Sequence, residues 1–328
     1  MRNPSVTSEC GRGRVSGVVA LRSPYPPVAL ASHDAAIILR MTTHSVFASG
    51  NDRTVRRVIL LVLDGLRPDA IERFDMTRLA SLARRGAATF TATTVSPSVT
   101  AACMASIFTG VSPDRHGVDS SRFHLGRPRE KLTPVPEVLD DARLRSEAFM
   151  ARVPWFMTRI ARQIARALHV DATFAGRESL EVLGAALPRL HAKRDGLLVL
   201  HWPDGDDAGH EHGWMSPQYE QAARRMDAAL GGLIEAASLF ETSDTLLVVM
   251  ADHGGGGADL RDHDSAHPLD RTIPIVFAGG GVTPGALSGP ISLLDVPPTI
   301  LWALGAPVPR SYHGRVLMEL FAREAAVA

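Results

Sequence analysis

The stretch Val58–Gly65 (VILLVLDG) decides the fold, because six consecutive apolar residues end in an aspartate and a glycine. A run that is apolar at every position predicts a strand buried on both faces, as in a parallel sheet covered by helices. Open α/β sheets bind their ligands at the carboxyl ends of such strands. We therefore expect Asp64 to lie in a functional site.

Strands and helices are expected to alternate along the rest of the chain. Apolar and threonine-rich runs predict further strands over residues 88–95, 196–201, 245–251 and 273–278. Helical spacing predicts helices over residues 76–85, 100–109, 155–168, 178–190, 216–239 and 296–304. The stretch 122–136 and the Asp- and Gly-rich stretch after residue 201 are predicted to be loops. This alternation indicates a three-layer α/β/α sandwich around one central, mostly parallel sheet.

The first 55 residues lack this pattern and mix arginines, prolines and short apolar fragments. We expect a disordered extension, or an upstream overrun with Met41 as the true start. Ala29–Ala31 has the form of a signal-peptidase site, but Arg22 and the prolines interrupt the apolar core that a signal peptide needs. We therefore expect a cytoplasmic protein, with export left open.

Residues 56–322 are expected to form a single catalytic domain. The chain has 35 lysines and arginines and 35 aspartates and glutamates, so its formal net charge is zero. It therefore has no overall positive charge that would attract nucleic acid or an anionic membrane surface. No apolar run has the length of a transmembrane helix. Cys10 and Cys103 lie far apart, so neither a disulfide framework nor a thiolate zinc site is indicated.

An aspartate and a histidine follow the predicted strand at residues 196–201. Asp206 and His210 lie four residues apart. On a turn or a helix start this offset brings both side chains to one side, where they can hold a zinc ion. Asp204 and Asp207 are rival ligands, and such a loop is equally typical of a solvated turn.

A second pair follows the predicted strand at residues 245–251. Asp252 and His253 are succeeded by Gly254–Gly257, which lets the backbone bend sharply beside an ion. His263 and His267 then compete to supply one more imidazole ligand.

Thr100 begins the predicted helix at residues 100–109. A threonine there is most often an N-cap. The same position favours a bound anion, and a zinc ion touching the hydroxyl would yield an alkoxide nucleophile near neutral pH. Both interpretations can hold together.

Three motifs accompany these residues: VLDGLRPD at 62–69, TGVSPDRHGV at 109–118 and LDVPPTI at 294–300. With them the chain resembles the alkaline phosphatase superfamily, and most closely its nucleotide pyrophosphatase/phosphodiesterase (type I phosphodiesterase) branch. The resemblance covers residues 58–317, with a poorly matched middle at 119–196 that is a candidate for a small substrate-recognition insert. It implies an alkaline-phosphatase-like fold and a metal-dependent hydrolase of phosphodiester or nucleotide pyrophosphate bonds.

The resemblance also implies a site with two divalent metal ions, zinc first, with Mn²⁺ or iron also compatible. Asp64, Thr100, Asp252 and His253 would surround one ion, and Asp206, His210 and His263 would hold the other. Thr100 would be the nucleophile that forms a phospho-threonine intermediate. His263 is preferred over His267 because it lies seventeen residues before Gly280, the spacing that the family uses. Cys103 and His267 are then candidates for substrate contact.

One position departs from the family pattern. Phosphodiesterase members usually carry an asparagine three residues after the nucleophile, and this chain has Cys103 there, a weaker donor. A phosphomonoesterase or phosphonate hydrolase is therefore the alternative. A sulfatase is disfavoured because no Cys-x-Pro-x-Arg motif surrounds either cysteine. A catalytically silent homologue is disfavoured because the sequence keeps every expected metal ligand and the expected nucleophile.

The expected substrate is a small anionic phosphate ester, with no nucleic-acid-binding surface evident. The oligomeric state is not readable from the sequence. Five residues are candidates to contact the leaving group: Phe123, His124, Arg127, Trp155 and Trp214.

Overall fold

The computed structural model describes residues 54–120, 128, 131–153, 155–156, 158–287 and 289–321. The extension expected over the first 55 residues thus lies outside the described residues, except for its last two. Val55 is buried, and its amide donates to the carbonyl of Ala303 at 3.1 Å. Within the described residues, the packed core therefore begins just before the first strand.

A single sheet of eight strands lies at the centre of the described residues, in the spatial order β4-β3-β5-β1-β6-β7-β2-β8. The strands are β1 (Arg57–Leu63), β2 (Ala87–Thr93), β3 (Arg145–Met150), β4 (Asp171–Phe174), β5 (Gly196–Trp202), β6 (Thr245–Met250), β7 (Thr272–Gly279) and β8 (Gly285–Ala286). Only β7 runs against its neighbours, pairing antiparallel with β6 and β2. The predicted mostly parallel sheet is confirmed.

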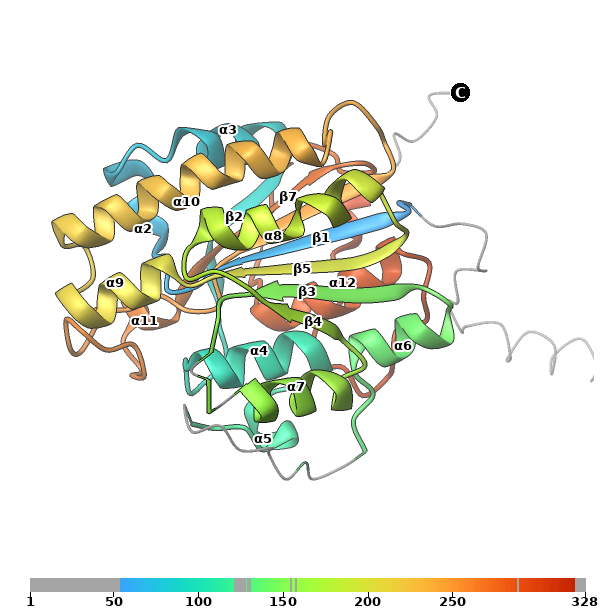
Figure 1. Cartoon of the computed structure of the whole chain (residues 1–328), viewed down its shortest axis with the longest axis horizontal. Helices are drawn as coiled ribbons and strands as arrows, with labels where there is room; N and C mark the ends of the chain where they lie inside the picture. The colour runs from blue at the N-terminus through green and yellow to red at the C-terminus, as the bar shows by residue number, and fades with distance from the viewer. Residues whose placement is uncertain are drawn as a thin grey trace, which may run out of the picture. The chain divides into compact units, whose positions relative to one another are not determined.

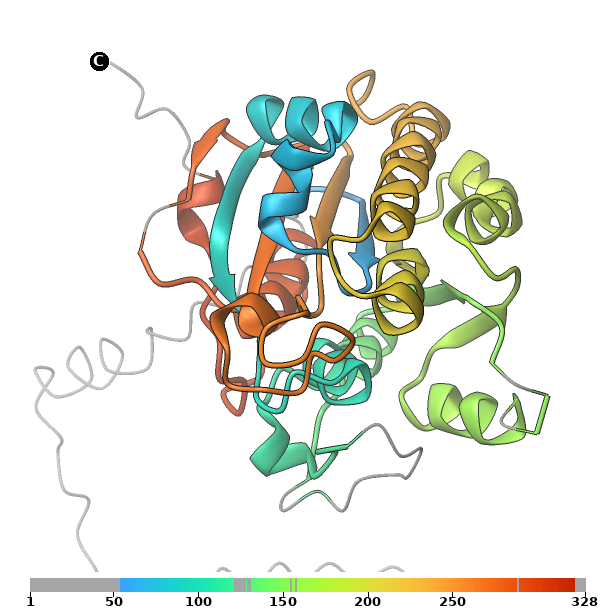
Figure 2. The same cartoon turned by 90° about the vertical axis from the view of Figure 1, so that its left-hand side faces the viewer.

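Helices cover both faces of this sheet (Figures 1 and 2). They are α2 (Pro68–Arg73), α3 (Thr77–Arg85), α4 (Thr100–Thr109), α5 (Pro113–His116), α6 (Val135–Asp141), α7 (Thr158–Ala167), α8 (Ser179–Ala192), α9 (Asp204–His212), α10 (Pro217–Ala236), α11 (Pro268–Arg271) and α12 (Val296–Ala303), with 3-10 turns at Leu293–Asp295 and Met318–Phe321. Helices α3, α8 and α10 lie on one face, and α4, α6 and α12 lie on the other. The predicted three-layer α/β/α architecture is therefore confirmed.

Burial explains the order of the strands. β1 is buried at all seven positions and pairs with β5 on one side and β6 on the other, so Leu60 lies between Val199 and Val248. Such runs need apolar side chains on both faces.

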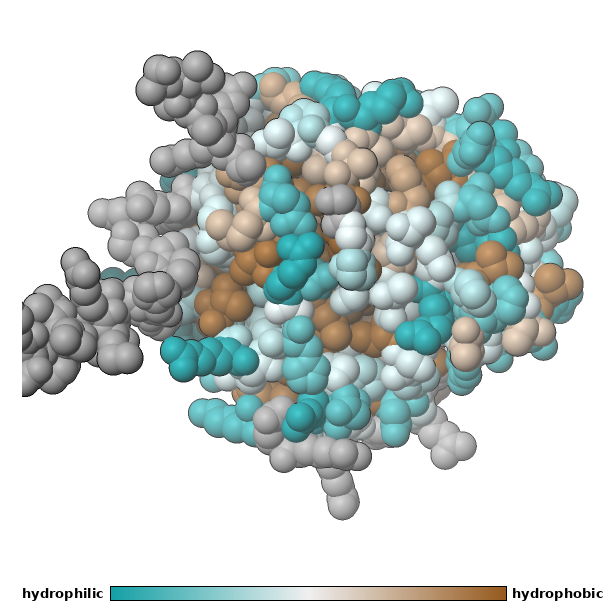
Figure 3. Space-filling model, turned by 180° about the vertical axis from the view of Figure 1, so that it is seen from behind, coloured by the Kyte–Doolittle hydropathy of each residue, from teal (hydrophilic) through white to brown (hydrophobic). Residues whose placement is uncertain are grey.

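Seen from behind, the molecule shows hydrophobic residues only in separate small patches among hydrophilic ones (Figure 3).

The predicted elements are all present, with bounds that shift by at most three residues. Three strands, β3, β4 and the two-residue β8, were not predicted. β3 and β4 lie toward one end of the sheet, where polar side chains are tolerated, and Glu147 within β3 pairs with Arg189 at 2.8 Å. The poorly matched segment at 119–196 thus extends the central sheet; its part in substrate recognition stays a prediction.

The loop prediction after residue 201 was wrong, because Asp204–His212 forms helix α9. The carboxylate of Asp204 accepts hydrogen bonds from the backbone and hydroxyl of Ser179 (2.8 and 3.0 Å). Three aspartates in the first turn also suit the positive end of a helix dipole. Tertiary contacts therefore outweigh the low helix propensity of glycine and aspartate.

The topology brings one set of strand ends together. β1, β2, β5 and β6 all end at the same edge of the sheet, and the reversed strand β7 begins there. Asp64 directly follows β1 at this edge, and Gly65 turns the chain with a φ of 68°. The Gly65 carbonyl accepts hydrogen bonds from Trp214 Nε1 and Tyr219 Oη, both at 2.9 Å.

Gly65 is also the point where β1 meets α9, which gives a testable prediction. A Cβ at this position would lie 3.0 Å from the Cα and the amide nitrogen of Asp206. We expect Gly65→Ala to lower the free energy of unfolding by more than about 1 kcal/mol, because it combines left-handed strain with this clash. Urea unfolding followed by circular dichroism measures the change.

Gly184→Ala is the matched control. Gly184 lies on the exposed side of α8, and an added Cβ would meet no atom within 4 Å. We expect this variant to be more stable by about 0.5–1 kcal/mol, since alanine favours a helix. A Gly65→Ala protein as stable as the unmodified chain would contradict the close packing of α9 on β1.

Candidate metal centre

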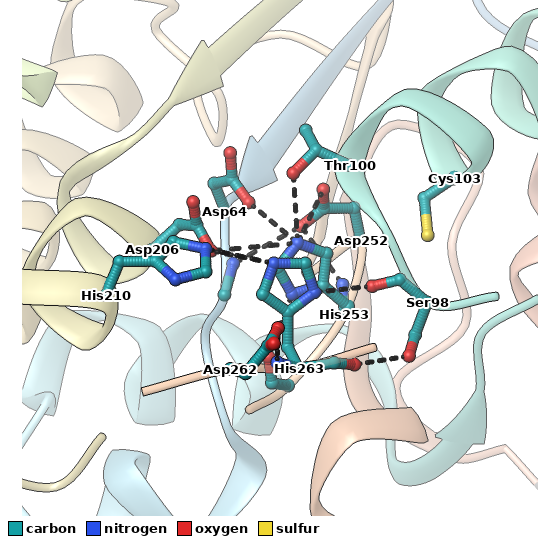
Figure 4. A network of polar contacts seen from close by, with 12 residues as sticks. Asp64, Ser98, Thr100, Cys103, Asp206, His210, Asp252, His253, Asp262 and His263 are labelled. Atoms are coloured by element: carbon teal, nitrogen blue, oxygen red, sulfur yellow. Dashed lines mark hydrogen bonds and ion pairs between the residues drawn. The ribbon is translucent and has the colours of Figure 1, made fainter. Parts of the chain in front are cut away.

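The structure brings all seven predicted site residues together at the carboxyl edge of the sheet (Figure 4). Asp64 follows β1, Thr100 begins α4, Asp206 and His210 lie on α9, Asp252 and His253 follow β6, and His263 lies in the loop before α11. Residues two hundred positions apart in the sequence thus share one cluster.

The three imidazoles of this cluster are oriented alike. Nδ1 of His210 donates to the Arg261 carbonyl (2.8 Å), and Nδ1 of His253 donates to the Gly254 carbonyl (2.8 Å). Nδ1 of His263 donates to the Ser98 carbonyl (2.7 Å). Because a carbonyl can only accept, each Nδ1 carries the proton, and each Nε2 presents a lone pair when the ring is neutral. This is the arrangement that orients metal-binding histidines.

The Nε2 atoms converge on carboxylates. Those of His210 and His263 lie 3.2 Å apart, and 3.4 and 3.5 Å from Oδ1 of Asp206. The lone pairs of two neutral imidazoles repel at this distance unless a cation lies between them. Ligand atoms of these three residues lie within 4.8 Å of one another, as the spacing of a single ion requires.

A second group surrounds His253. Its Nε2 lies 3.1 Å from Thr100 Oγ1, 3.2 Å from Asp64 Oδ1 and 3.5 Å from Asp252 Oδ2. Asp206 Oδ1 is also near, at 3.9 Å. Asp206 therefore lies between the two groups and is within reach of an ion in either.

The three carboxylates of the cluster are only partly neutralised by the nearby imidazoles. One oxygen each of Asp64, Asp206 and Asp252 is buried and makes no hydrogen bond. Burial and the charge of Asp64 raise the pKa of Asp252 to about 6, and the same causes raise the pKa of Asp206 well above its usual range. Positive charge would relieve both effects, so the donor set fits divalent cations.

His253 carries the opposite shift. Burial lowers its pKa, but the charge of Asp252 and a hydrogen bond and charge from Asp64 outweigh burial and raise it to about 10. Burial and the nearby His253 lower the pKa of His263 to about 4. At neutral pH, His263 is therefore ready to bind a metal, whereas His253 must first lose a proton.

His201 is a site residue that the sequence reasoning missed. It is buried in β5, opposite Val62 of β1, and its Nε2 lies 3.1 Å from Asp64 Oδ2. Burial would raise the pKa of Asp64, but the charges and hydrogen bonds of His201 and His253 outweigh it and lower that pKa. His201 also forms a third potential metal-binding group with Asp64 and Asp252. The sequence feature that could have identified His201 is its position next to the last residue of a buried strand that ends at the site.

The other predicted contacts are placed differently. Thr100 is the first residue of α4 and does not cap it, since Val99 occupies the cap position. Cys103 is fully buried, with its Sγ 3.3 Å from Thr94 Oγ1. His267 caps α11 by accepting from the Leu269 amide at 3.1 Å. The roles of Cys103 and His267 in substrate binding stay predictions.

Trp214 lies behind the histidines. It is buried, and its ring packs edge-on against His210 and His263 at centroid distances of 5.4 and 5.7 Å. It therefore supports the ligands rather than facing solvent. Trp155 is 87% exposed. Phe123, His124 and Arg127 lie outside the described residues.

Comparisons with known proteins bear on the fold and on the family. The human GPI ethanolamine phosphate transferase 3 catalytic subunit is 30% identical over 147 residues, which are 43% of this chain and 13% of that protein. The chain thus spans a small part of that relative. A Vibrio parahaemolyticus protein in the alkaline phosphatase superfamily has a TM-score of 0.64 at 17% identity, covering 83% of this chain and 72% of its own. Murine ectonucleotide pyrophosphatase/phosphodiesterase 5 has a TM-score of 0.60 at 14% identity, covering 77% and 96%.

The two solved structures show a shared fold. The family evidence comes from the sequence: the profile of type I phosphodiesterase / nucleotide pyrophosphatase matches residues 58–276, which is more than half of the chain. This span runs from β1 into β7 and contains every residue of the cluster. The chain therefore belongs to the type I phosphodiesterase / nucleotide pyrophosphatase family.

Proposed function

We propose that the chain is a metal-dependent hydrolase that cleaves phosphodiester or nucleotide pyrophosphate bonds with Thr100 as its nucleophile. The observation that carries this proposal is the position of Thr100. Its hydroxyl lies 3.1 Å from His253 Nε2, within the cluster of carboxylates and imidazoles, and the residue is only partly buried. A substrate can therefore reach the hydroxyl.

Two zinc ions are the proposed cofactors, with manganese or iron as compatible substitutes. One would be held by Asp64, Thr100, Asp252 and His253, and the other by Asp206, His210 and His263. When bound, the ions supply Lewis acidity, which lowers the pKa of the threonine hydroxyl and neutralises charge on phosphorus-bound oxygens. Three carboxylates against two divalent cations leave a net positive site that attracts an anionic ester.

The residues of the chain then act in two displacements. The Thr100 oxygen attacks phosphorus, and the alcohol or nucleotide fragment departs with a proton, leaving a phospho-threonine that still carries the second ester substituent of the substrate. The N-terminus of α4 stabilises the negative phosphoryl oxygens, since its first amides face outward from the helix. Water then cleaves the phospho-threonine bond and restores the hydroxyl. Cys103 is buried one helical turn away and has no side-chain amide, so it differs from the asparagine usual in the family.

Two relatives bear on the chemistry. A threonine-to-alanine variant of the murine phosphodiesterase is inactive and has been solved in complex with AMP. A phosphonate monoester hydrolase from Silicibacter pomeroyi shares the fold, with a TM-score of 0.58. The first favours a threonine nucleophile and a nucleotide leaving group; the second keeps the phosphonate or monoester alternative as an outcome of the test.

The substrate class is tested with a matched pair of esters. We expect the zinc-loaded protein to hydrolyse bis-p-nitrophenyl phosphate with a higher kcat/KM than p-nitrophenyl phosphate, because one net positive charge suits a monoanionic diester. Release of p-nitrophenolate measures both rates. A strong preference for the monoester would replace the phosphodiesterase proposal with the phosphomonoesterase alternative.

The nucleophile is tested by substitution. We expect Thr100→Ala to lower kcat by at least roughly 10³-fold, because the attacking oxygen is removed. Thr100→Ser should retain part of the activity, and both variants should keep the metal content of the unmodified chain. A phosphorylated peptide containing residue 100, isolated after rapid acid quench, would identify the intermediate. Full activity in Thr100→Ala would show that another group attacks.

Metal affinity should depend on pH. His253 holds a proton below about pH 10 and Asp252 holds one below about pH 6, and each must lose it to bind a metal. We expect zinc affinity to fall about tenfold per pH unit from pH 8 towards 6, and more steeply as Asp252 also becomes protonated. His263, neutral above about pH 4, adds nothing over this range.

Isothermal titration calorimetry in buffers of different ionisation enthalpy measures both the affinity and the protons released. Proton release on zinc binding at pH 7 is the expected result. An affinity that stays constant between pH 6 and 8, with no proton release, would show that His253 is already neutral in the metal-free protein.

A further inference from the structure

One stretch of the chain departs from the overall charge balance. Residues 151–170 contain four arginines and neither aspartate nor glutamate, although the whole chain has a formal net charge of zero. The arginines are Arg152, Arg159, Arg162 and Arg166. The average charge, which argued against an anionic membrane partner, thus conceals a local basic segment.

These arginines are free to interact with a partner. All four are exposed, and within the described residues none of their guanidinium groups has a hydrogen-bond or carboxylate partner. Some surface arginines elsewhere are paired: Arg224 lies 2.9 Å from Glu220, and Arg315 lies 2.7 Å from Glu319. Residues 151–170 differ because four exposed arginines occur there with no acidic residue among them.

Exposed aromatic rings lie beside the arginines. Trp155 and Phe156 are 87% and 62% exposed, and their rings contact each other edge to face at 6.0 Å. Ile160, in the first turn of α7, is 37% exposed. Leaving the two aromatic side chains largely in water is unfavourable by about 1.5–3 kcal/mol each relative to burial, so a surface of this kind indicates a binding site.

The surface lies on the catalytic side of the sheet. β3 runs parallel to β5, and its last residue, Met150, pairs with His201, which contacts Asp64. The chain leaves β3 at the same edge that carries the metal ligands and reaches Trp155 five residues later. Helix α7 then lies beside β4 at this side of the molecule (Figures 1 and 2).

We propose that Trp155, Phe156, Ile160 and the four arginines form a surface that binds the interface of an anionic membrane. Aromatic rings favour the headgroup level, and arginines are attracted to anionic lipids. An oligonucleotide would satisfy the arginines through phosphates, but would not cover the aliphatic side chain of Ile160. None of the described helices is long and apolar enough to cross a bilayer.

Flotation with lipid vesicles tests this proposal, and it does not depend on turnover. We expect the full chain to float with phosphatidylcholine vesicles that contain phosphatidylglycerol, and not with phosphatidylcholine alone. Added salt should release it, since the attraction is electrostatic in part. The combined variant Arg159→Gln, Arg162→Gln, Arg166→Gln should bind roughly a hundredfold more weakly. Trp155→Ser with Phe156→Ser should weaken binding on the order of tenfold or more.

Two control substitutions should leave vesicle binding unchanged. Leu180 is 54% exposed on α8, and Arg84 is exposed at the end of α3. Leu180→Ser and Arg84→Gln therefore match the chemistry of the test variants at other surfaces. Circular dichroism verifies that all variants are folded.

Four results would overturn the proposal. The first is equal binding of test and control variants to anionic vesicles, and the second is no binding by the unmodified chain. The third is a dimer, seen by light scattering, that the Trp155→Ser, Phe156→Ser variant dissociates; a second copy of the chain would then be the occupant. In the fourth result, a single-stranded oligonucleotide displaces the vesicles from the arginines, and the aromatic substitutions do not change vesicle binding. That result would identify a nucleic-acid site.

Discussion

Three imidazoles turned inward by backbone carbonyls are the constraint on which the rest of this site depends. Each Nδ1 donates to a carbonyl, so each Nε2 faces the carboxylates of Asp64, Asp206 and Asp252. The three carboxylates crowd around these nitrogens, and one buried oxygen of each makes no hydrogen bond. Such an arrangement is unfavourable without cations and favourable with them.

The fold supplies this constraint from the sheet outward. Parallel strands β1, β5 and β6 end together, so the residues after them meet at one edge. The reversed strand β7 lets the loop that carries His263 return to the same edge. Ser98 and His263 exchange two hydrogen bonds, which ties that loop to the segment just before Thr100. Glycines at 65 and 205 allow α9 to approach β1 so closely that Asp206 lies between the two ligand groups.

Much of this arrangement could be predicted because its signals are local. The run Val58–Leu63 is apolar at every position, and only a doubly covered strand explains it. Asp64, Asp252 and His253 follow such strands directly, so strand ends predicted their meeting. Helix α9 was missed because its stability comes from Asp204 bonding to Ser179, a contact made across 25 positions of sequence. His201 was missed because a histidine inside a buried strand has the pattern of a core residue.

The proposed centre would hold two ions on separate histidines, and zinc stoichiometry tests that claim most directly. Mass spectrometry of dialysed, zinc-loaded protein should find two ions per chain. His263→Gln should lose one of them, because His263 Nε2 lies 3.5 Å from Asp206 in the cluster. His267→Gln should keep both, because that ring caps α11. Fewer than two ions in the unmodified chain, or loss from His267→Gln instead of His263→Gln, would contradict the account.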